Sequence, residues 1–465
     1  MIVYCECCAP GILGTAIKLR KIRTDGIMKK KLYILTFLLI SFFIIFTILF
    51  LSKNKNILAL VETYKICFKY SFINKITSCE EYFASKLNLY HWVDRKDEKS
   101  LRDLMGLKKI VISSSKEEKP GTAIKILNFS TKSIKELNIN DGVNRPFHFF
   151  SETYITPPIY IYEIKDASVF IGNDTRKFLV FKNGFYTLMG RGSNSVRRIL
   201  EKLLEKEEVF YEKETRNIYS VRDFAQLFEI KNKTIFFHGD WNLYHIIMEA
   251  APGLILRNDS GYKINLSYPS KQNTEILDAL GEKEIILTKL FSLEKFDQLI
   301  LPSPILENNA HFPNIELMNT LIKKLKINFF NKTKIKPLGK KIYVSRSDAS
   351  RRKVLNESEL IKYLKKRGFK IVVPGEYSVA DQSRLFEEAE IIIGPHGLGL
   401  VNMLFANNLK TVIELFPINW YPNCYLRIAQ VKGAKNYYGL FHDPEDLSTS
   451  NFNVNIAEII KILDK

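Results

Sequence analysis

Short apolar runs alternate with amphipathic stretches through the second half of the chain. Residues 234–237, 341–345 and 411–415 are mostly apolar and rich in β-branched or aromatic side chains. Between such runs, residues 314–330 place apolar side chains at helical spacing. Strands that are apolar throughout are typical of parallel sheets buried on both faces. The pattern therefore predicts an α/β fold in which strands and helices alternate.

The same patterns predict the other elements. Asn183-Gly184 lies at the centre of residues 178–188, between two apolar runs, and predicts a β-hairpin. Asn356 followed by Glu359 has the sequence of a capping box, so we expect a helix that begins there. A helix is also expected directly after GPHG (394–397), and a linker at 332–340. Further strands are expected at 109–113, 160–171, 284–287, 298–301, 370–373 and 390–394, and further helices at 195–208, 242–256 and 379–388.

One segment near the start has a different composition. Residues 32–51 read LYILTFLLISFFIIFTILFL and contain no charged residue, which is long enough for a helix to cross a bilayer. No small-residue cleavage site follows the segment, which favours an anchor over a signal peptide. Basic residues are concentrated before it, so the positive-inside rule assigns residues 1–31 to the cytosol. We therefore expect a single-pass type II protein with a stem at 52–103.

Length and charge narrow the choice of ligand. The chain has 465 residues, which is too many for one ordinary core, and we expect two domains at 104–335 and 336–465. The formal net charge is +19, with the lysines scattered along the chain. A basic domain outside the cytosol favours anionic nucleotide sugars, glycans or lipid headgroups as partners, and argues against nucleic acid.

Residues 238–252 (HGDWNLYHIIMEAAP) are the first of four candidate sites. On a helix, His245 and Glu249 lie at i and i+4 and therefore on one face. Such a pair serves as a general base and the group that orients it. The structural alternative is a core histidine beside an ordinary ion pair.

The other three candidates lie at expected strand ends, where parallel sheets bind their ligands. SRSDASRRKVLNE (345–357) supplies arginines, whose planar fork binds phosphate oxygens, or it is a solvated loop. GPHGLGL (394–400) brings small residues to a helix N-terminus, which suits an anion, although glycine and proline also make simple corners. Glu414 offers a carboxylate to ribose hydroxyls, or it serves as an N-cap or a structural ion pair.

Together these stretches resemble glycosyltransferase family 61 from about His238 to Tyr438. The resemblance rests on WNLYHIIMEAAPGL, YVSRSDASRRKVLNE, GFKIVVPGEYSVADQSRLFEEAEIIIGPHGLGLVNMLFA and VIELFP, in that order. Leu398 stands where relatives typically have alanine, and Ile246 stands where they often have tryptophan. Neither difference removes a polar group.

The resemblance implies a GT-B fold, in which two Rossmann-like domains face a cleft and the C-terminal one binds the nucleotide sugar. It also implies an inverting transfer that needs no metal. In agreement, the sequence contains no Asp-x-Asp motif, which in the other glycosyltransferase fold binds the metal that holds the diphosphate. The base is expected among His245, Glu249 and Asp240, with His245 favoured. Arg346 and either Arg351 or Arg352 would neutralise the diphosphate, and Glu414 or Glu357 would hold the ribose. The full set expected at the donor is Ser345, Arg346, Arg351, Arg352, Asn356, Glu357, Pro395, His396, Gly397, Leu398, Gly399, Asn402 and Glu414.

The function implied is transfer of N-acetylglucosamine, xylose or arabinose from a UDP-sugar to a glycan or glycoprotein. No cofactor is expected besides this donor. A type II anchor places the enzyme in the Golgi or ER membrane, because those compartments import nucleotide sugars into their lumen. The alternatives are a catalytically inactive, membrane-tethered glycan-binding protein on the same fold and an unrelated sugar-phosphate transferase of GT-B type.

Overall fold

The computed structural model describes residues 88–464, with gaps at 93, 95, 120–122, 128–152, 172–176, 191–208, 212–215, 217, 221–228, 241, 257–260, 288–291 and 307–310. Two compact units divide the chain. One comprises Met1–His91 with Leu204–Arg222, and the larger comprises Trp92–Leu203 with Asp223–Lys465. The expected anchor at 32–51, the cytosolic tail, most of the stem and the helix at 195–208 lie outside the described residues. Among the described helices, none has the length and apolar character needed to cross a membrane.

The smaller unit contains three paired strands within its described part. β10 (Ile218–Ser220) pairs antiparallel with β9 (Val209–Tyr211) and with the start of β1 (Asn88–Trp92), where Leu89 lies opposite Tyr219.

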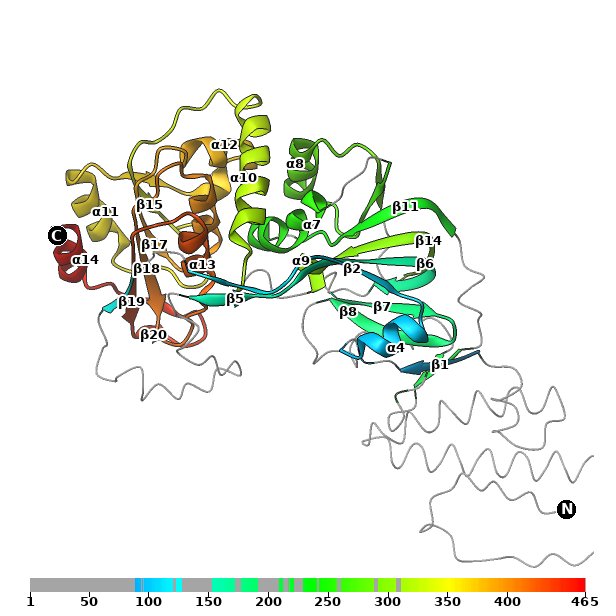
Figure 1. Cartoon of the computed structure of the whole chain (residues 1–465). Helices are drawn as coiled ribbons and strands as arrows, with labels where there is room; N and C mark the ends of the chain where they lie inside the picture. Colours follow the sequence, from blue (N-terminus) through cyan, green and yellow to red (C-terminus); the bar gives the residue numbers. More distant parts are fainter. Residues whose placement is uncertain are drawn as a thin grey trace, which may run out of the picture. The chain divides into compact units, whose positions relative to one another are not determined.

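A mixed sheet forms the first half of the larger unit (Figure 1). β13 (Ile285–Leu287), β12 (Lys263–Leu266), β11 (Glu229–Phe237) and β14 (Ser292–Pro302) run parallel. β14 then pairs antiparallel with the long β6 (Ile159–Ile171), which also pairs with β2 (Lys108–Ser113). β7 (Lys177–Lys182) and β8 (Phe185–Gly190) extend the antiparallel part, while β3 (Lys116–Glu118) pairs separately with β5 (Tyr154–Thr156).

The turn between β7 and β8 is the predicted hairpin. Asn183 and Gly184 have φ values of 54° and 73°. Two successive positive φ angles match the twist of the flanking strands, and Asn-Gly adopts them at low cost. The hairpin prediction is therefore confirmed.

Several helices accompany this sheet within the described residues. They are α4 (Glu98–Asp103), α6 (Leu243–His245), α7 (Ala251–Ile255), α8 (Lys271–Leu280), α9 (Ser303–Leu306) and α10 (Ile315–Phe330). Asn314 caps α10 by accepting a hydrogen bond from the Leu317 N–H, which confirms the helix expected at 314–330. β12 and α8 were not expected from the sequence.

The single helix expected at 242–256 is interrupted by a π-helical turn, η5 (Ile246–Ala250). Pro252 has no N–H to donate to the carbonyl four residues back, and its ring crowds that carbonyl. The N–H of Ala251 instead bonds the carbonyl of Ile246, five residues back, which widens the turn. Wide turns of this kind are frequent at functional sites.

A fully parallel sheet forms the second half of the larger unit, in the order β16-β15-β17-β18-β19-β4. Its strands are β15 (Lys341–Val344), β16 (Lys370–Val372), β17 (Ile391–Pro395), β18 (Thr411–Pro417), β19 (Asn436–His442) and β4 (Ala123–Leu127). α11 (Glu357–Lys366), α12 (Val379–Leu385), α13 (Cys424–Val431), α14 (Ile456–Leu463) and the 3₁₀ helix η7 (Leu398–Phe405) accompany them, and β20 (Pro444–Asp446) pairs with β21 (Asn451–Phe452).

Both faces of the parallel sheet are buried. Successive residues of β18 join two different clusters, with Val412 and Phe416 in one and Ile413 and Leu415 in the other. Because side chains alternate between faces along a strand, each face carries its own apolar layer. Two buried faces explain why these strands are apolar throughout, and the predicted α/β alternation is confirmed.

The helix expected after the GPHG turn is present and is of the 3₁₀ type, whereas the capping box expected at Asn356 is wrong. The GPHG turn leads into a 3₁₀ helix, because Leu400 bonds the carbonyl three residues back and the Asn402 side chain donates to Gly399. Asn356 precedes α11 but forms no capping box. Its side chain bonds both backbone groups of Val454 instead, at 2.9 Å each.

Candidate functional site

The parallel sheet has a reversal of strand order at β15 (Figure 1). From β15 the chain proceeds to β16 on one side, and then returns to β17 on the other. At such a point the connections leave in opposite directions, so a crevice opens beyond the carboxyl ends of the strands. Ser345 and Arg346 follow β15, and His396 to Gly399 follow β17. The second and third candidate stretches therefore meet at this crevice.

A cavity of about 220 Å³ lies in the crevice. Its walls combine residues after β15, residues around Pro374 after β16, and the glycine-rich turn after β17. Leu243 and Gln272 close it from the first half of the larger unit. The lining comprises Leu243, Gln272, Ser345, Arg346, Asp348, Ala349, Pro374, Gly375, Gln382, Leu398 and Gly399.

Arg346 packs directly on Gly397. A Cβ atom added to Gly397 would lie 1.6 Å from Nη1 of Arg346, so only glycine leaves room for this guanidinium group. The φ angle of Gly397 is 171°, an extended value open to any residue. Glycine is therefore required here for the close approach of Arg346 and not for its backbone conformation.

Arg352 is the second arginine of the site, in preference to Arg351. Arg351 donates Nε and Nη2 to the carbonyl of Ser448, at 3.2 and 2.8 Å, and is exposed. Arg352 is partly buried, with a φ of 56°, and its guanidinium carbon lies 5.7 Å from the Trp420 ring centre. A bulky residue at positive φ stores strain, which often marks functional positions.

Arg346 and Arg352 form a pocket of positive charge. Burial lowers the pKa of Arg346, and burial together with the charge of Arg346 lowers the pKa of Arg352 to about 10. Arginine side chains are protonated at neutral pH in proteins, so both groups carry a positive charge. Their buried Nε atoms have no hydrogen-bond partner within the described part of the chain. Two partly desolvated guanidinium groups whose Nε–H groups remain available as hydrogen-bond donors are suited to bind an anion such as a diphosphate.

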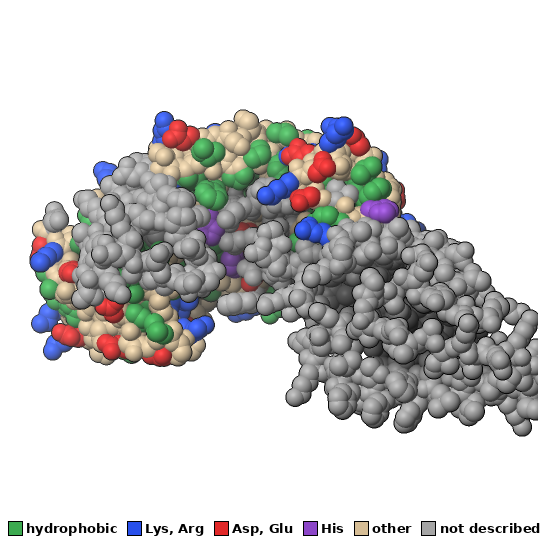
Figure 2. Space-filling view, turned by 90° about the horizontal axis from the view of Figure 1, so that it is seen from below, with side chains coloured by type: hydrophobic (Ala, Val, Ile, Leu, Met, Phe, Trp, Pro, Cys, Tyr) green, Lys and Arg blue, Asp and Glu red, His purple; other side chains and the backbone are tan. Residues whose placement is uncertain are grey.

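This concentration of charge is not repeated among the coloured side chains of the face seen in Figure 2. On the face seen in Figure 2, basic and acidic side chains are interspersed, with histidines in a recess among them. The excess of lysine and arginine therefore does not produce a single broad basic face in this view.

Glu414 lies beneath the site and is fully buried. One oxygen contacts Nδ1 of His396 at 2.5 Å, and the other accepts the hydroxyl of Tyr437. Burial raises the pKa of Glu414 well above its usual range. The carboxylate therefore fixes His396, the residue before Gly397, and has no surface to offer to a ribose. The expected ribose contact of Glu414 does not fit this geometry.

Three other expected donor residues also have structural partners. Glu357 accepts the hydroxyl of Tyr343 at 2.9 Å. Asn356 is held by Val454, as described above. Asn402 is buried and donates to Gln382 at 2.8 Å, so it contacts the cavity lining from behind. Pro395 is a buried residue at the end of β17.

His245 and Glu249 meet on the π-helical turn. Nδ1 of His245 lies 3.1 Å from a Glu249 oxygen, and Nε2 of His238 lies 3.9 Å from the same oxygen. Glu249 is buried, whereas the His245 side chain is 18% exposed and thus reachable. Asp240, the third candidate base, accepts the Asn242 N–H at 2.8 Å and is buried.

The two candidate sites are linked by short contacts within the larger unit. Leu243 lines the cavity two residues before His245. The Tyr244 ring meets the Tyr425 ring at 5.6 Å, and Tyr425 meets the His396 ring at 5.0 Å. The pair His245 and Glu249 and the glycine-rich turn therefore lie in one region of the larger unit.

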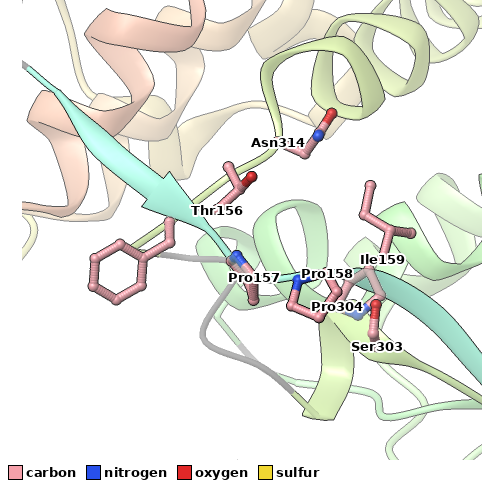
Figure 3. Close-up of a pocket in the computed structure, with 8 residues that line it drawn as sticks. Thr156, Pro157, Pro158, Ile159, Ser303, Pro304 and Asn314 are labelled. Atoms are coloured by element: carbon pink, nitrogen blue, oxygen red, sulfur yellow. The ribbon is translucent and has the colours of Figure 1, made fainter. Parts of the chain in front are cut away.

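A second cavity is too small for a substrate. It has a volume of about 10 Å³, which is room for a single water molecule. Figure 3 shows it where β5 leads into β6, with Thr156, Ser303 and Asn314 near Pro157, Pro158 and Pro304. Ser303 accepts the N–H of Tyr160 at 3.0 Å, so this region has a structural role.

Sequence reasoning missed several lining residues. Asp348 lies within the arginine-rich stretch and shortly after a strand end, so its position in the sequence could have identified it as a candidate ligand-binding residue. Gln272 and Leu243 carry no local signal, because only the packing of the two halves of the unit brings them to the cavity. Tyr437 and Tyr425 lie on elements that the sequence patterns did not reveal.

Comparison with known proteins agrees with this geometry. Residues 243–413, which include every residue of the cavity, match the family model of Glycosyltransferase 61. The EGF domain-specific O-linked N-acetylglucosamine transferase of Bos taurus is 34% identical over 111 residues, 22% of this chain and 21% of that protein. The protein of that name from Drosophila melanogaster is 34% identical over 106 residues, 22% of this chain and 20% of its own length. The chain thus covers about a fifth of the curated relatives it matches. The resemblance drawn from the motifs is confirmed over residues 243–413, which match the sequence pattern of glycosyltransferase family 61.

Proposed function

We propose that the protein transfers a sugar from a UDP-sugar to a glycan or glycoprotein acceptor, with inversion at the anomeric carbon. The observation that supports this most strongly is the pair Arg346 and Arg352 beside Gly397, at the reversal of the parallel sheet. A diphosphate placed there would meet two charged guanidinium groups and the free N–H groups of a glycine-rich turn. GT-B organisation, with the donor on the parallel-sheet side, is part of the same proposal.

The arginines replace a metal in this scheme. When the bond between the sugar and the diphosphate breaks, negative charge develops on the leaving UDP. Preorganised cations in a partly desolvated site stabilise such charge without reorganisation. Arg346 and Arg352 are already in place, since Arg346 packs on Gly397 and donates Nη2 to the Arg351 carbonyl at 3.1 Å. We therefore propose a metal-independent reaction.

His245 is the proposed general base. In an inverting transfer the acceptor oxygen attacks the anomeric carbon, the bond to the diphosphate breaks, and one proton leaves the acceptor hydroxyl. Glu249 lies 3.1 Å from Nδ1 of His245, so its negative charge would stabilise the imidazolium that forms when His245 accepts the acceptor's proton. Asp240 is less suited, because it is buried and accepts the Asn242 N–H.

The relatives suggest which donor to test first. Their names describe transfer of N-acetylglucosamine to EGF domains. UDP-N-acetylglucosamine is therefore the first candidate donor for this chain, with UDP-xylose and UDP-arabinose as the others. We also propose a type II anchor at 32–51 that holds the catalytic part in the Golgi or ER lumen, where donors are imported.

Donor turnover tests the proposal. The full chain would be incubated with each of the three donors, with and without EDTA, while UDP release is followed. We expect turnover of one donor that survives EDTA. Arg352→Ala should reduce turnover by roughly 10²- to 10³-fold, as losses of transition-state charge stabilisation do. Arg351→Ala is the matched control from the same loop, and should leave turnover nearly unchanged because its side chain only bonds Ser448.

The results also separate the alternatives. Equal losses in the two arginine variants would contradict the assignment of the anion site to Arg352. A protein that binds UDP and glycan but turns over no donor in the presence of acceptor would be the inactive glycan-binding protein. Turnover that EDTA abolishes would overturn the metal-independent mechanism.

A further inference from the structure

The residues assigned a role so far leave the hydroxyl groups of a nucleotide sugar without a carboxylate partner. Sugar hydroxyls in protein sites are usually held by carboxylates, which accept one or two O–H groups each. The two carboxylates expected from the sequence are engaged elsewhere. Glu414 is buried against His396 and Tyr437, and Glu357 accepts the Tyr343 hydroxyl.

Asp348 is the acidic residue that lines the cavity. It lies in a turn closed by the Ala349 N–H, which donates to the Arg346 carbonyl at 3.0 Å. The turn directs its carboxylate toward Gly375 on the far wall. A Cβ atom added to Gly375 would lie 2.7 Å from Oδ2 of Asp348, so a larger residue there would displace the carboxylate.

The carboxylate of Asp348 is available for a ligand. Across the described residues, no N–H or O–H group donates to it, although its charge partly offsets the burial that lowers the pKa of Arg346. Its position is also distinct from that of the arginine pair. Arg346 packs toward Gly397 after β17, whereas Asp348 and Gly375 form the part of the cavity next to β16.

We propose that Asp348 accepts a hydroxyl hydrogen bond from the nucleotide sugar, with the ribose of the nucleotide as its first candidate. This rests on the proposed function, because it assumes a diphosphate at Arg346. With the diphosphate beside Gly397, a nucleoside that extends toward β16 places its ribose over Gly375. The O–H groups of the ribose then face the carboxylate.

Binding of UDP and its deoxy analogues tests the proposal on the full chain. Calorimetry would compare UDP, 2′-deoxy-UDP and 3′-deoxy-UDP on the wild type, Asp348→Asn and Asp348→Ala. For UDP, we expect Asp348→Ala to weaken binding about 10-fold or more, which is typical for loss of a hydrogen bond to a charged group. At least one deoxy analogue should lack the hydroxyl that Asp348 binds. Its affinity for the wild type should equal the affinity of UDP for Asp348→Ala, and it should bind the wild type and Asp348→Ala equally well. Asp464→Asn is the matched control. Asp464 is an exposed carboxylate directly after α14 and pairs with Arg367, so this variant should bind UDP as the wild type does.

A second arm identifies which sugar is held. If UDP binds the wild type and Asp348→Ala equally, but the KM for the UDP-sugar rises in the variant, Asp348 holds the transferred sugar instead of the ribose. If neither UDP binding nor the KM changes while the wild type binds UDP, the inference about Asp348 is wrong and the proposed function stands. If the wild type binds neither UDP nor any UDP-sugar, both are overturned.

Discussion

At the scale of single residues, Gly397 determines where the Arg346 guanidinium lies. The added methyl of alanine would occupy the position of Nη1, at a separation of 1.6 Å. The backbone of Gly397 is extended, so alanine itself is tolerated without strain. The cost of the substitution is therefore a displaced arginine in an otherwise folded protein.

Gly397→Ala should therefore weaken UDP binding by about 10-fold or more, since a charge-assisted contact to the diphosphate is lost. In an Arg346→Ala background the same change should have little further effect, because no guanidinium remains to be displaced. Titration of UDP into the two single variants and the double variant measures this coupling. Additive losses would show that Gly397 acts independently of Arg346, for example through its own N–H.

The residue types at the site were largely readable from the sequence, but their partners were not. The strand end of β15 and the GPHGLGL turn identified Arg346 and Gly397, because the physics of parallel sheets assigns ligands to such ends. The choice between Arg351 and Arg352 depended on the Ser448 carbonyl, nearly a hundred residues away. Likewise, Glu414 is removed from the cavity by Tyr437, a partner from the neighbouring strand that no local pattern indicates.

At the scale of elements, the start of α11 is held by tertiary contacts instead of a capping box. The side-chain amide of Asn356 donates to the carbonyl of Val454 and accepts its N–H. These bonds join the helix start to the segment that precedes α14. They also employ the nitrogen to which a glycan would be attached in the sequon Asn356-Glu357-Ser358, so a glycan there would replace one of the two hydrogens on this nitrogen.

Asn356→Ala should lower the free energy of unfolding by roughly 1–3 kcal/mol, because the two backbone groups of Val454 lose their partner. Asn453→Ala is a matched control, since Asn453 is exposed and bonds only the Glu445 side chain. The control should change stability by no more than about 0.5 kcal/mol. Chemical denaturation of the three proteins measures both values, and equal stabilities for the two variants would contradict the structural role of Asn356.

At the scale of the whole molecule, a backbone hydrogen bond is among the contacts between helices of the two sheets of the larger unit. Glu275 on α8 accepts the N–H of Val379, the first residue of α12, at 2.7 Å. One turn earlier on α8, Gln272 reaches the cavity. α8, which accompanies the mixed sheet, thus accepts a hydrogen bond from the first turn of α12 and also supplies a residue that lines the candidate donor site.

Most strands of the two sheets were predictable, whereas β12, β19 and β4 were not. Parallel strands that are buried on both faces have continuous apolar sequences, which can be recognised without the structure. The strands expected from β15 to β18 are confirmed. β12 is only four residues long, and β4 reaches the parallel sheet from far upstream by pairing with β19. Such pairing depends on long-range packing that periodicity does not encode.

The central claim is that a nucleoside diphosphate binds between Arg346 and the glycine-rich turn. Calorimetric titration of UDP into the full chain, Arg346→Ala and the control Arg351→Ala tests it most directly. We predict binding to the wild type and to Arg351→Ala with similar affinity, and binding weaker by about 10-fold or more in Arg346→Ala. Absence of UDP binding to the folded wild type, or equal affinity in the wild type and Arg346→Ala, would contradict the claim.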